Sequence, residues 1–244
     1  MTATTYLRVM AMAMVALAAG AGGCHKTQPV CTLRQAEEDF TQYKSASPSL
    51  ASGFSREAID PDRRRYGVVL LSDKSWGRKE PYTGYYAALL MRDGDELVRA
   101  AAAAALGRCG GTQYLPNLVA GLSDSSTTVR QEAAVALGRV AGPSGLAALQ
   151  RAAVLDPCDD VRSACAVSLG GYPRMEAVTT LMKCLDDRAF AVRRAARATL
   201  AKLAGRDYGD DPHGWSDWLA RSTQAGRPLR DNRGWNPFTF KNKS

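Results

Sequence analysis

Apolar residues recur at helical spacing through the middle of the chain, from residue 92 to residue 205. They fall three to five positions apart, which keeps one side of a helix apolar, and no alternating strand pattern competes with them. Four of these stretches begin with a Val-Arg pair, and consecutive pairs are 31 or 32 residues apart, at Val98, Val129, Val161 and Val192. A period of this length predicts an array of similar helical units.

Each unit is expected to contain two helices. The first carries Leu and Val on one side, at Leu115, Leu118 and Leu122, at Leu146, Leu149 and Val154, and at Val178, Leu181 and Leu185. The second follows an acidic turn and is rich in Ala, which is the best helix former. Three of the second helices end in Leu-Gly, and the fourth has Ala201 in place of the Gly. We therefore expect an all-α solenoid in which each helix pair shields the apolar face of the next.

The acidic turn, the Val-Arg pair, the Ala-rich helix and the Leu-Gly ending resemble the short HEAT-like repeat of the phycobilisome-lyase type. This resemblance implies a superhelix of antiparallel helix pairs and says little about function. We expect the repeat domain to span residues 55–222, with a degenerate leading repeat in which Arg65 corresponds to Arg99. A cap helix is expected to begin at Asp211-Pro212, because Asp is a good N-cap and Pro a good first helical residue. Residues 203–212 with Trp215 and Trp218 resemble the C-terminal signature of exported bacterial HEAT-repeat lipoproteins.

Residues 1–24 have the pattern of an export signal, with a weakly positive start, an apolar run and small residues before Cys24. The apolar run is about half of the roughly 20 residues that span a bilayer. Residues 21–24 resemble a bacterial lipobox, which implies lipidation of Cys24 and a lipid-anchored envelope protein facing the periplasm. Because His25 follows the Cys, the resemblance favours the outer membrane. The alternative is an ordinary signal peptide that leaves Cys24 unmodified.

The remaining flanks are expected to be an N-terminal helix and linker at 25–54 and an extended tail at 223–244. Apart from Cys24 the chain has five Cys, and none has the C-x-x-C spacing of a zinc ribbon or a thioredoxin-like motif. Three of them are expected to be core residues of the repeats. Whether any disulfide forms stays open among Cys31, Cys109, Cys158, Cys165 and Cys184.

Composition and charge narrow the function classes. With 45% hydrophobic residues the chain has enough apolar side chains for a packed core. The net charge of +8 is not concentrated in one block, and an exported protein has no access to the genome. We therefore expect no nucleic-acid partner.

Catalytic chemistry finds little support in the residues. Iron-dependent hydroxylases of the HEAT type hold their metal with repeated His-Glu pairs, whereas this chain has two His, His25 and His213, both outside the repeats. No catalytic triad or phosphate-binding loop occurs at credible spacing. The prediction is a protein that is not an enzyme, with no catalytic residue, cofactor or metal. The alternatives are a lyase-like relative of the same repeat family, or an enzyme or metal-binding protein that uses the acidic cap.

Two charged groups have a structural explanation. The acidic cap, with Asp207, Asp210, Asp211 and His213, offers oxygen ligands that suit Ca²⁺, but Asp211 is already explained as a helix cap. The Arg residues of the Val-Arg pairs stand next to the acidic turns, so we expect them to pair with Asp within the chain, at Arg99, Arg130, Arg162 and Arg193.

The second helices also offer a candidate binding surface. If they line the concave side, their outward positions carry five basic residues separated by small ones, namely Arg108, Arg139, Arg194, Arg197 and Lys202. A shallow positive groove of this kind can accept a helix or an acidic peptide, and the alternative is a solvated face. The predicted function is a protein-interaction scaffold of the cell envelope, bound to a membrane through its lipid, with its partner and oligomeric state open. A purely structural envelope spacer is a further alternative.

Overall fold

A computed structural model describes residues 60–172, 175–209 and 211–224 of the chain. The predicted export signal with Cys24, the segment 25–54 and the tail from residue 225 lie outside these ranges. No helix within them has the length and apolar character needed to cross a bilayer.

The described residues form ten α-helices and no strand, which confirms the all-α prediction. The helices are α4 (Pro61–Asp73), α5 (Tyr82–Arg92), α6 (Glu96–Cys109), α7 (Leu115–Gly121), α8 (Thr127–Val140), α9 (Pro143–Leu155), α10 (Asp159–Ser168), α11 (Met175–Cys184), α12 (Phe190–Ala204) and α13 (Pro212–Gln224). Three short 3₁₀ helices join them, η1 (Trp76–Arg78), η2 (Thr112–Tyr114) and η3 (Leu169–Gly171).

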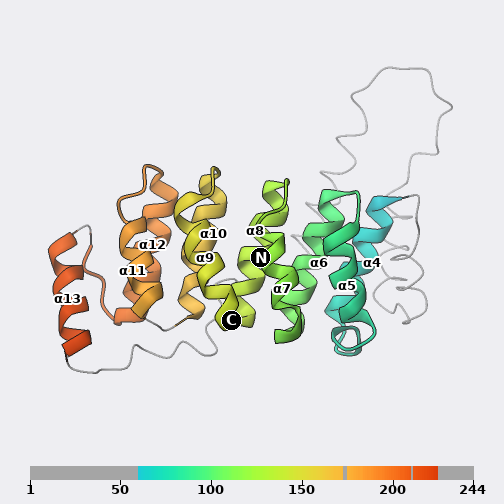
Figure 1. Cartoon of the computed structure of the whole chain (residues 1–244), viewed down its shortest axis with the longest axis horizontal. Coiled ribbons are helices and arrows are strands. Elements are labelled where there is room, and N and C mark those ends of the chain that lie inside the picture. Colours follow the sequence, from blue (N-terminus) through green and yellow to red (C-terminus); the bar gives the residue numbers. More distant parts are fainter. Residues whose placement is uncertain (1–59, 173–174, 210, 225–244) are drawn as a thin grey trace, which may run out of the picture. The chain divides into compact units, whose positions relative to one another are not determined.

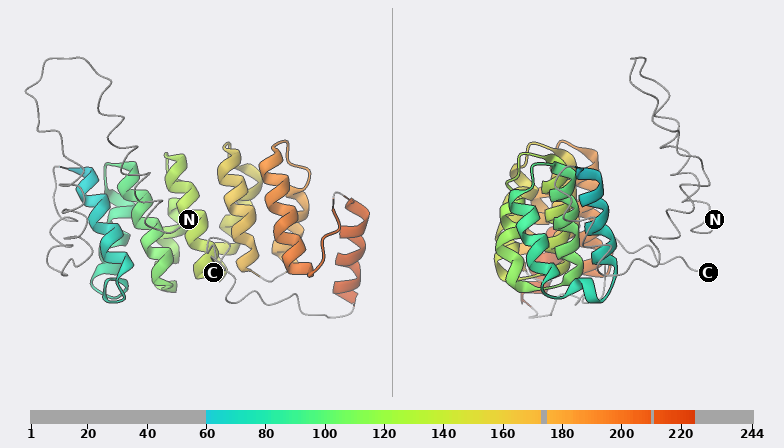
Figure 2. Two further views of the ribbon diagram at one scale, coloured as in Figure 1. Left: turned by 180° about the vertical axis from the view of Figure 1, so that it is seen from behind. Right: turned by 90° about the vertical axis from the view of Figure 1, so that its right-hand side faces the viewer.

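These helices stack in two layers (Figures 1 and 2). The second-helix layer contains α4, α6, α8, α10 and α12, and each of these helices packs against the next. The first-helix layer contains α5, α7, α9 and α11, which also contact one another in order. Helix α4 packs against α6 and therefore occupies a second-helix position at the start of the array. At the other end, α13 follows α12 (Figure 1).

The repeated apolar positions fill the space between the layers. The Leu of each Leu-Gly or Leu-Ala pair is almost completely buried, at Leu106, Leu137, Leu169 and Leu200. Ala102, Ala133 and Ala196 are fully buried, which allows neighbouring helices to approach closely. This arrangement is the core that the sequence pattern predicts, and it confirms the HEAT-like solenoid.

Close helix packing explains the Gly of the Leu-Gly motif. A Cβ atom on Gly107 would lie 2.8 Å from the Cα of Ala136 on the next second helix. A Cβ on Gly138 would lie 2.8 Å from the Cβ of Ser168 in the same way. No described second helix packs beyond α12, so the last copy can carry Ala201 at this position.

The Arg residues of the Val-Arg pairs tie successive helix pairs together. Arg99 binds Asp124, Arg130 binds Asp156 and Arg162 binds Asp187, each through Nε and Nη2 at 2.8–3.1 Å. These three predicted pairings are confirmed. At the start of the array, however, Arg64 binds Asp93, while Arg65 makes an exposed pair with Asp62. Arg64, and not Arg65, therefore corresponds to Arg99, because the irregular connection after α4 shifts the register by one residue.

Aromatic residues close both ends of the described array. At the leading end, the buried Tyr86 hydroxyl donates to the carbonyl of Gly77. At the other end Trp215 is fully buried and its indole N–H donates to the carbonyl of Gly209. The Asp211 carboxylate accepts the backbone N–H of His213, which confirms Asp211 as the N-cap of α13.

All four Cys in the described ranges are free thiols. Cys165 and Cys184 are buried core residues, as the repeat pattern predicts. Burial raises the pKa of the Cys184 thiol to about 11, so this group is protonated at neutral pH. Cys109 and Cys158 are half-buried, and Cys31 lies outside the described residues.

Candidate partner-binding surface

The outward positions of the second helices form a surface that we call the second-helix face. Its residues are spaced three and four apart along each helix and therefore share one side. They are Ala101, Ala104 and Arg108 on α6, Glu132, Val135 and Arg139 on α8, Val167 on α10, Gly171 on η3, and Ala195, Ala198 and Lys202 on α12. Most of these side chains are partly exposed, and small or apolar ones separate the charges.

Three charged groups come together on α6 and α8. Arg108 and Arg139 occupy equivalent positions in the last turns of their helices and are both half-buried. Burial raises the pKa of the Glu132 carboxyl, and the nearby Arg139 and Arg108 lower it. Burial also lowers the pKa of Arg139, as does the positive charge of Arg108. This corner of the surface thus holds two cations and one anion, all incompletely hydrated.

Arg108 retains unused hydrogen-bonding capacity. Its Nε atom is buried and has no hydrogen-bond partner among the described residues. A buried donor without an acceptor costs free energy, and an added carboxylate would remove that cost. Arg108 is therefore a residue of the second-helix face that an anionic ligand would stabilise.

The other predicted basic residues do not join this pair. Lys202 occupies the position equivalent to Arg108 and Arg139, but Gly171 stands between them in the third copy and interrupts the row of charges. Lys202 is exposed as a whole residue. Its amine is nevertheless partly shielded from water, which lowers its pKa. Arg194 is an exposed residue near the start of α12.

Arg197, which the sequence also predicts as a binding residue, forms an ion pair within the chain. It donates from Nε and Nη2 to the carboxylate of Asp207, at 2.9–3.2 Å. The equivalent positions in the earlier copies are fully buried or nearly so, at Ala103, Ala134 and Ala166, because the next second helix packs there. At α12 that place is taken by the loop that precedes α13, so Arg197 pairs within the chain.

The acidic cap is likewise used internally where it is described. Asp207 pairs with Arg197, Asp211 caps α13, and His213 is exposed; Asp210 lies outside the described residues. A different group, Cys158 with Asp159 and Asp160, brings three possible ligand atoms within 4.8 Å at the start of α10. Acidic residues are stabilising in a first helical turn, which explains this group without a metal.

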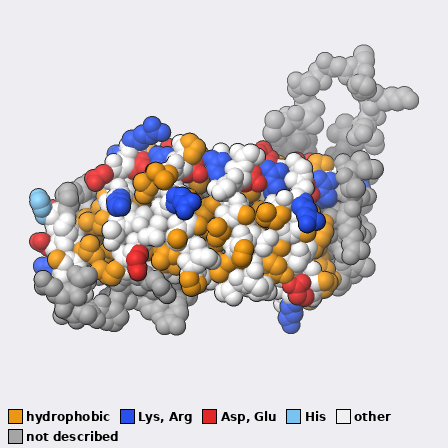
Figure 3. Space-filling view, in the orientation of Figure 1, with side chains coloured by type: hydrophobic (Ala, Val, Ile, Leu, Met, Phe, Trp, Pro, Cys, Tyr) orange, Lys and Arg blue, Asp and Glu red, His pale blue; other side chains and the backbone are white. Residues whose placement is uncertain are grey.

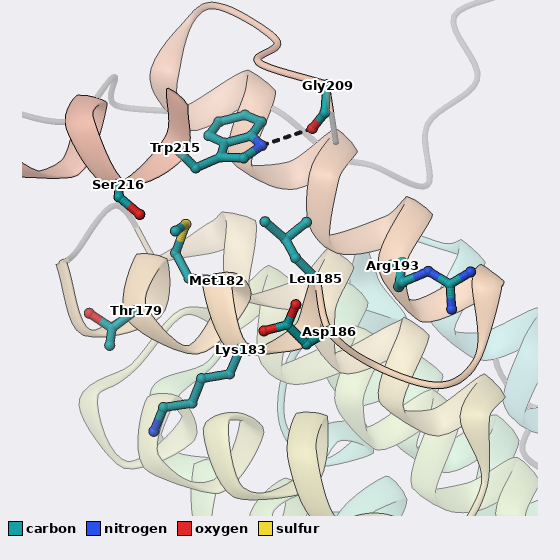
Figure 4. A pocket seen from close by; sticks show the side chains of 9 residues that line it. All are labelled: Thr179, Met182, Lys183, Leu185, Asp186, Arg193, Gly209, Trp215 and Ser216. Atoms are coloured by element: carbon teal, nitrogen blue, oxygen red, sulfur yellow. Dashed lines mark hydrogen bonds between the residues drawn. The ribbon is translucent and has the colours of Figure 1, made fainter. Parts of the chain in front are cut away.

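A cavity lies between α11 and α13, away from the charged corner (Figure 4). Its volume is about 480 Å³, and its walls combine apolar and charged side chains, from Thr179, Met182, Lys183, Leu185, Asp186, Arg193, Gly209, Trp215 and Ser216. Helical periodicity cannot predict this cavity, because it forms where the regular stack meets the atypical α13. The one signal in the sequence is the Val-Arg pair at Arg193, which no regular acidic turn follows.

Charged side chains of both signs also line one edge of the first-helix face. Figure 3 shows them alternating along its upper edge, over the turns that lead from first to second helices. The rest of this face is mostly apolar and uncharged, with a few separate charged side chains of both signs (Figure 3). The first-helix face therefore offers no concentration of one charge for a ligand.

Comparison with known proteins supports the same fold. Residues 87–170 match the family model of HEAT repeats. The complex of CpcE and CpcF of phycocyanin lyase from Nostoc sp. PCC7120 superposes with a TM-score of 0.56 at 20% identity, covering 78% of this chain and 74% of that one. The Escherichia coli protein YibA superposes with a TM-score of 0.55 at 20% identity, covering 79% and 70%. No curated protein sequence matches the chain.

The chain thus has the fold of a HEAT-like solenoid, and this fold is shared with the phycocyanin lyase complex. One prediction from the sequence is overturned by this comparison. Because the sequence lacks catalytic motifs, we predicted that the protein is not an enzyme. A phycocyanin lyase, which is an enzyme, nevertheless has this solenoid fold. The absence of familiar catalytic motifs therefore does not exclude catalysis on such a scaffold.

Proposed function

We propose that this HEAT-like repeat protein is a scaffold of the cell envelope that binds an acidic segment of a partner protein on its second-helix face. The observation that carries the proposal is the half-buried pair of Arg108 and Arg139, with the Arg108 Nε lacking an acceptor among the described residues. The small side chains beside this pair, such as Ala101 and Ala104, leave room for a helix or an extended peptide to approach the backbone.

Electrostatics favours an anionic partner at this position. Arg presents a planar fork that matches a carboxylate, and partial burial makes the interaction stronger than in open water. Glu132 offsets part of the positive charge, and burial disfavours the ionised form of its carboxyl group. A ligand carboxylate would compete with Glu132 for the two Arg side chains, so the charge of residue 132 should oppose binding.

The binding test uses charge changes of opposite sign on one surface. The full-length protein, purified from its native envelope, is used to capture partners, which are quantified by mass spectrometry. Arg108→Glu with Arg139→Glu should reduce a captured partner at least tenfold, whereas Glu132→Gln should increase it. Arg92→Glu with Arg151→Glu makes the same charge change on exposed positions of the first-helix layer and serves as the control. Equal capture by all variants that keep their helical circular dichroism would overturn the proposal.

The proposed membrane anchor is the lipid on Cys24, with the outer membrane as the favoured location. It rests on the lipobox-like residues 21–24 and the apolar run before them. Acyl chains on a Cys hold a protein stably when two or more are present. Cys24→Ser should leave the protein unprocessed or release it into the soluble fraction. Normal maturation with retention in the membrane would contradict the anchor.

A lyase-like role is a second candidate, favoured by the fold shared with the phycocyanin lyase complex. In that case the second-helix face would hold a partner on which the protein acts. The distinguishing measurement is the intact mass of a captured partner before and after incubation with the protein and an envelope extract. A mass increase that depends on the protein supports this role, and an unchanged mass supports the scaffold alone.

A further inference from the structure

The Arg of each Val-Arg pair is held in the same way by its own turn. Nη1 of Arg99, Arg130 and Arg162 donates to two backbone carbonyls, five and six residues earlier. Arg193 does the same, to the carbonyls of Asp187 and Arg188 at 2.8 and 2.9 Å. These two hydrogen bonds fix one side of the guanidinium and leave Nε and Nη2 on the other side for a carboxylate.

Arg193 differs from the other three because no carboxylate of the described residues binds that second side, although the Phe190 ring lies 5.8 Å from its Cζ atom. Within the described ranges, its Nε and Nη2 have no carboxylate partner. In the earlier copies the carboxylate comes from the turn of the following helix pair, 25 or 26 residues along the chain. No such turn is described after α13. Asp207 is already bound by Arg197, and the nearby Asp186 makes no ion pair with Arg193 in the described structure.

Arg193 lines the cavity between α11 and α13, and in Figure 4 its guanidinium points outward from the edge of the cavity, away from Trp215. Thr179 and Lys183 lie opposite Arg193 in the same view. Met182, Leu185 and the buried Trp215 provide apolar walls. The site therefore combines a pre-oriented guanidinium with an apolar recess of about 480 Å³. A ligand with a carboxylate next to an apolar group matches both parts.

We propose that Arg193 and this cavity bind an Asp side chain of a partner protein, together with an apolar side chain next to it. Four Asp side chains are bound in this way by Arg64, Arg99, Arg130 and Arg162, and they show the form that the ligand takes. Each of them also accepts a backbone N–H two residues further along, as Asp124 does from Ser126 and Asp187 from Ala189. The recognised feature is thus an Asp turn at the start of a helix, with an apolar residue beside it. In effect, the partner supplies the acidic turn of one more repeat.

This site is independent of the second-helix face, because it uses the opposite end of α12 from Lys202 and involves neither Arg108 nor Arg139. Its geometry depends only on Arg193, its own turn and the cavity walls. Failure of the proposed scaffold function at Arg108 would therefore leave the Arg193 site untouched, and the reverse also holds.

The experiment uses the full mature chain labelled with ¹⁵N and a synthetic peptide with the sequence of residues 182–196, which presents the Asp turn of the fourth repeat. The Arg193 Nε–H resonance is identified by its loss in Arg193→Lys. Adding the peptide should shift this resonance, and a peptide with Asn at the position of Asp187 should not. Peptide affinity should fall at least about tenfold in Arg193→Gln. It should be unchanged in Arg188→Gln, which removes an exposed charge from the same turn.

Two results would overturn the proposal. One is a resonance that neither peptide shifts, or that both shift equally. The other is an Arg193 Nε–H resonance that changes in Asp231→Asn without any peptide, because this would place the chain's own tail, and not a partner, at the site.

Discussion

Arg130 donates from Nε and Nη2 to the two carboxylate oxygens of Asp156, at 2.8 and 3.1 Å, across the boundary between consecutive helix pairs. Its Nη1 also binds the carbonyls of Asp124 and Ser125 in its own turn. Asp156 in turn accepts the backbone N–H of Cys158 and so shapes the start of the next helix. One side chain thus links two turns, and this linkage is a nearest-neighbour interaction of the kind that stabilises repeat proteins.

Removing one Arg of this series should destabilise the array more than removing an exposed Arg. The side chains of Arg99 and Asp124 are 15% and 14% exposed, whereas those of Arg65 and Asp62 are 40% and 78% exposed. Arg99→Ala leaves a largely buried carboxylate without its cation, so we expect a loss of about 3 kcal/mol in the free energy of unfolding. Arg65→Ala should cost about 1 kcal/mol or less. Urea unfolding of both variants measures the difference, and equal losses would contradict this account.

The same pairs predict how stability depends on pH. The Arg99 guanidinium holds the pKa of Asp124 below its usual value, and Arg162 does the same for the pKa of Asp187. Their contribution is therefore fully present above the unfolded pKa of about 3.9 and is lost as the pH falls through the lower folded values. Unfolding midpoints measured from pH 7 to pH 3 should stay level above about pH 5 and then fall. Asp124→Asn should be less stable at pH 7 and show a shallower fall in acid.

The repeat period predicts most of this fold because every interior copy has the same neighbours. Val-Arg, the Ala-rich helix and the buried Leu recur in one register, and the structure places them in equivalent environments. The Arg–Asp pairs of the interior copies followed from the same regularity. The prediction was wrong by one residue at Arg64, where an irregular connection lies between α4 and α5 and the period is lost.

The candidate surface was harder to predict, because exposure at the end of an array differs from exposure inside it. Arg197 has the spacing of an outward residue, yet it faces the place where another helix would pack and binds Asp207. The sequence did not predict a role for Glu132, because a single acidic residue in a helix does not indicate which residues it contacts. Its effect on Arg139 depends on burial, which a periodic pattern does not give.

The Gly of the Leu-Gly motif should be needed only where another second helix follows. A methyl group at Gly107 would lie 2.8 Å from the Cα of Ala136, so Gly107→Ala should cost about 1–3 kcal/mol despite the better helix propensity of Ala. Gly94→Ala, where the added atom meets nothing within 4 Å, is the matched control and should be close to neutral. Ala201→Gly should also destabilise, by about 1 kcal/mol, since it lowers helix propensity without relieving any contact. Stabilisation by Ala201→Gly would show that the Gly serves something other than helix packing.

The ends of the second helices offer a test in the stabilising direction. Helices α6 and α12 end at Gly110 and Gly205 in the left-handed region, with φ of 69° and 73°, which Gly adopts without steric cost. Helix α8 ends at Ala141 with φ of 48°, where the Cβ atom is unfavourable. Ala141 is exposed, so a change there affects the backbone alone. Ala141→Gly should therefore raise the free energy of unfolding by about 0.5–1 kcal/mol, and Gly110→Ala should lower it by a similar amount. Thermal unfolding followed by circular dichroism measures both, and a Tm that falls in Ala141→Gly would contradict the left-handed end of α8.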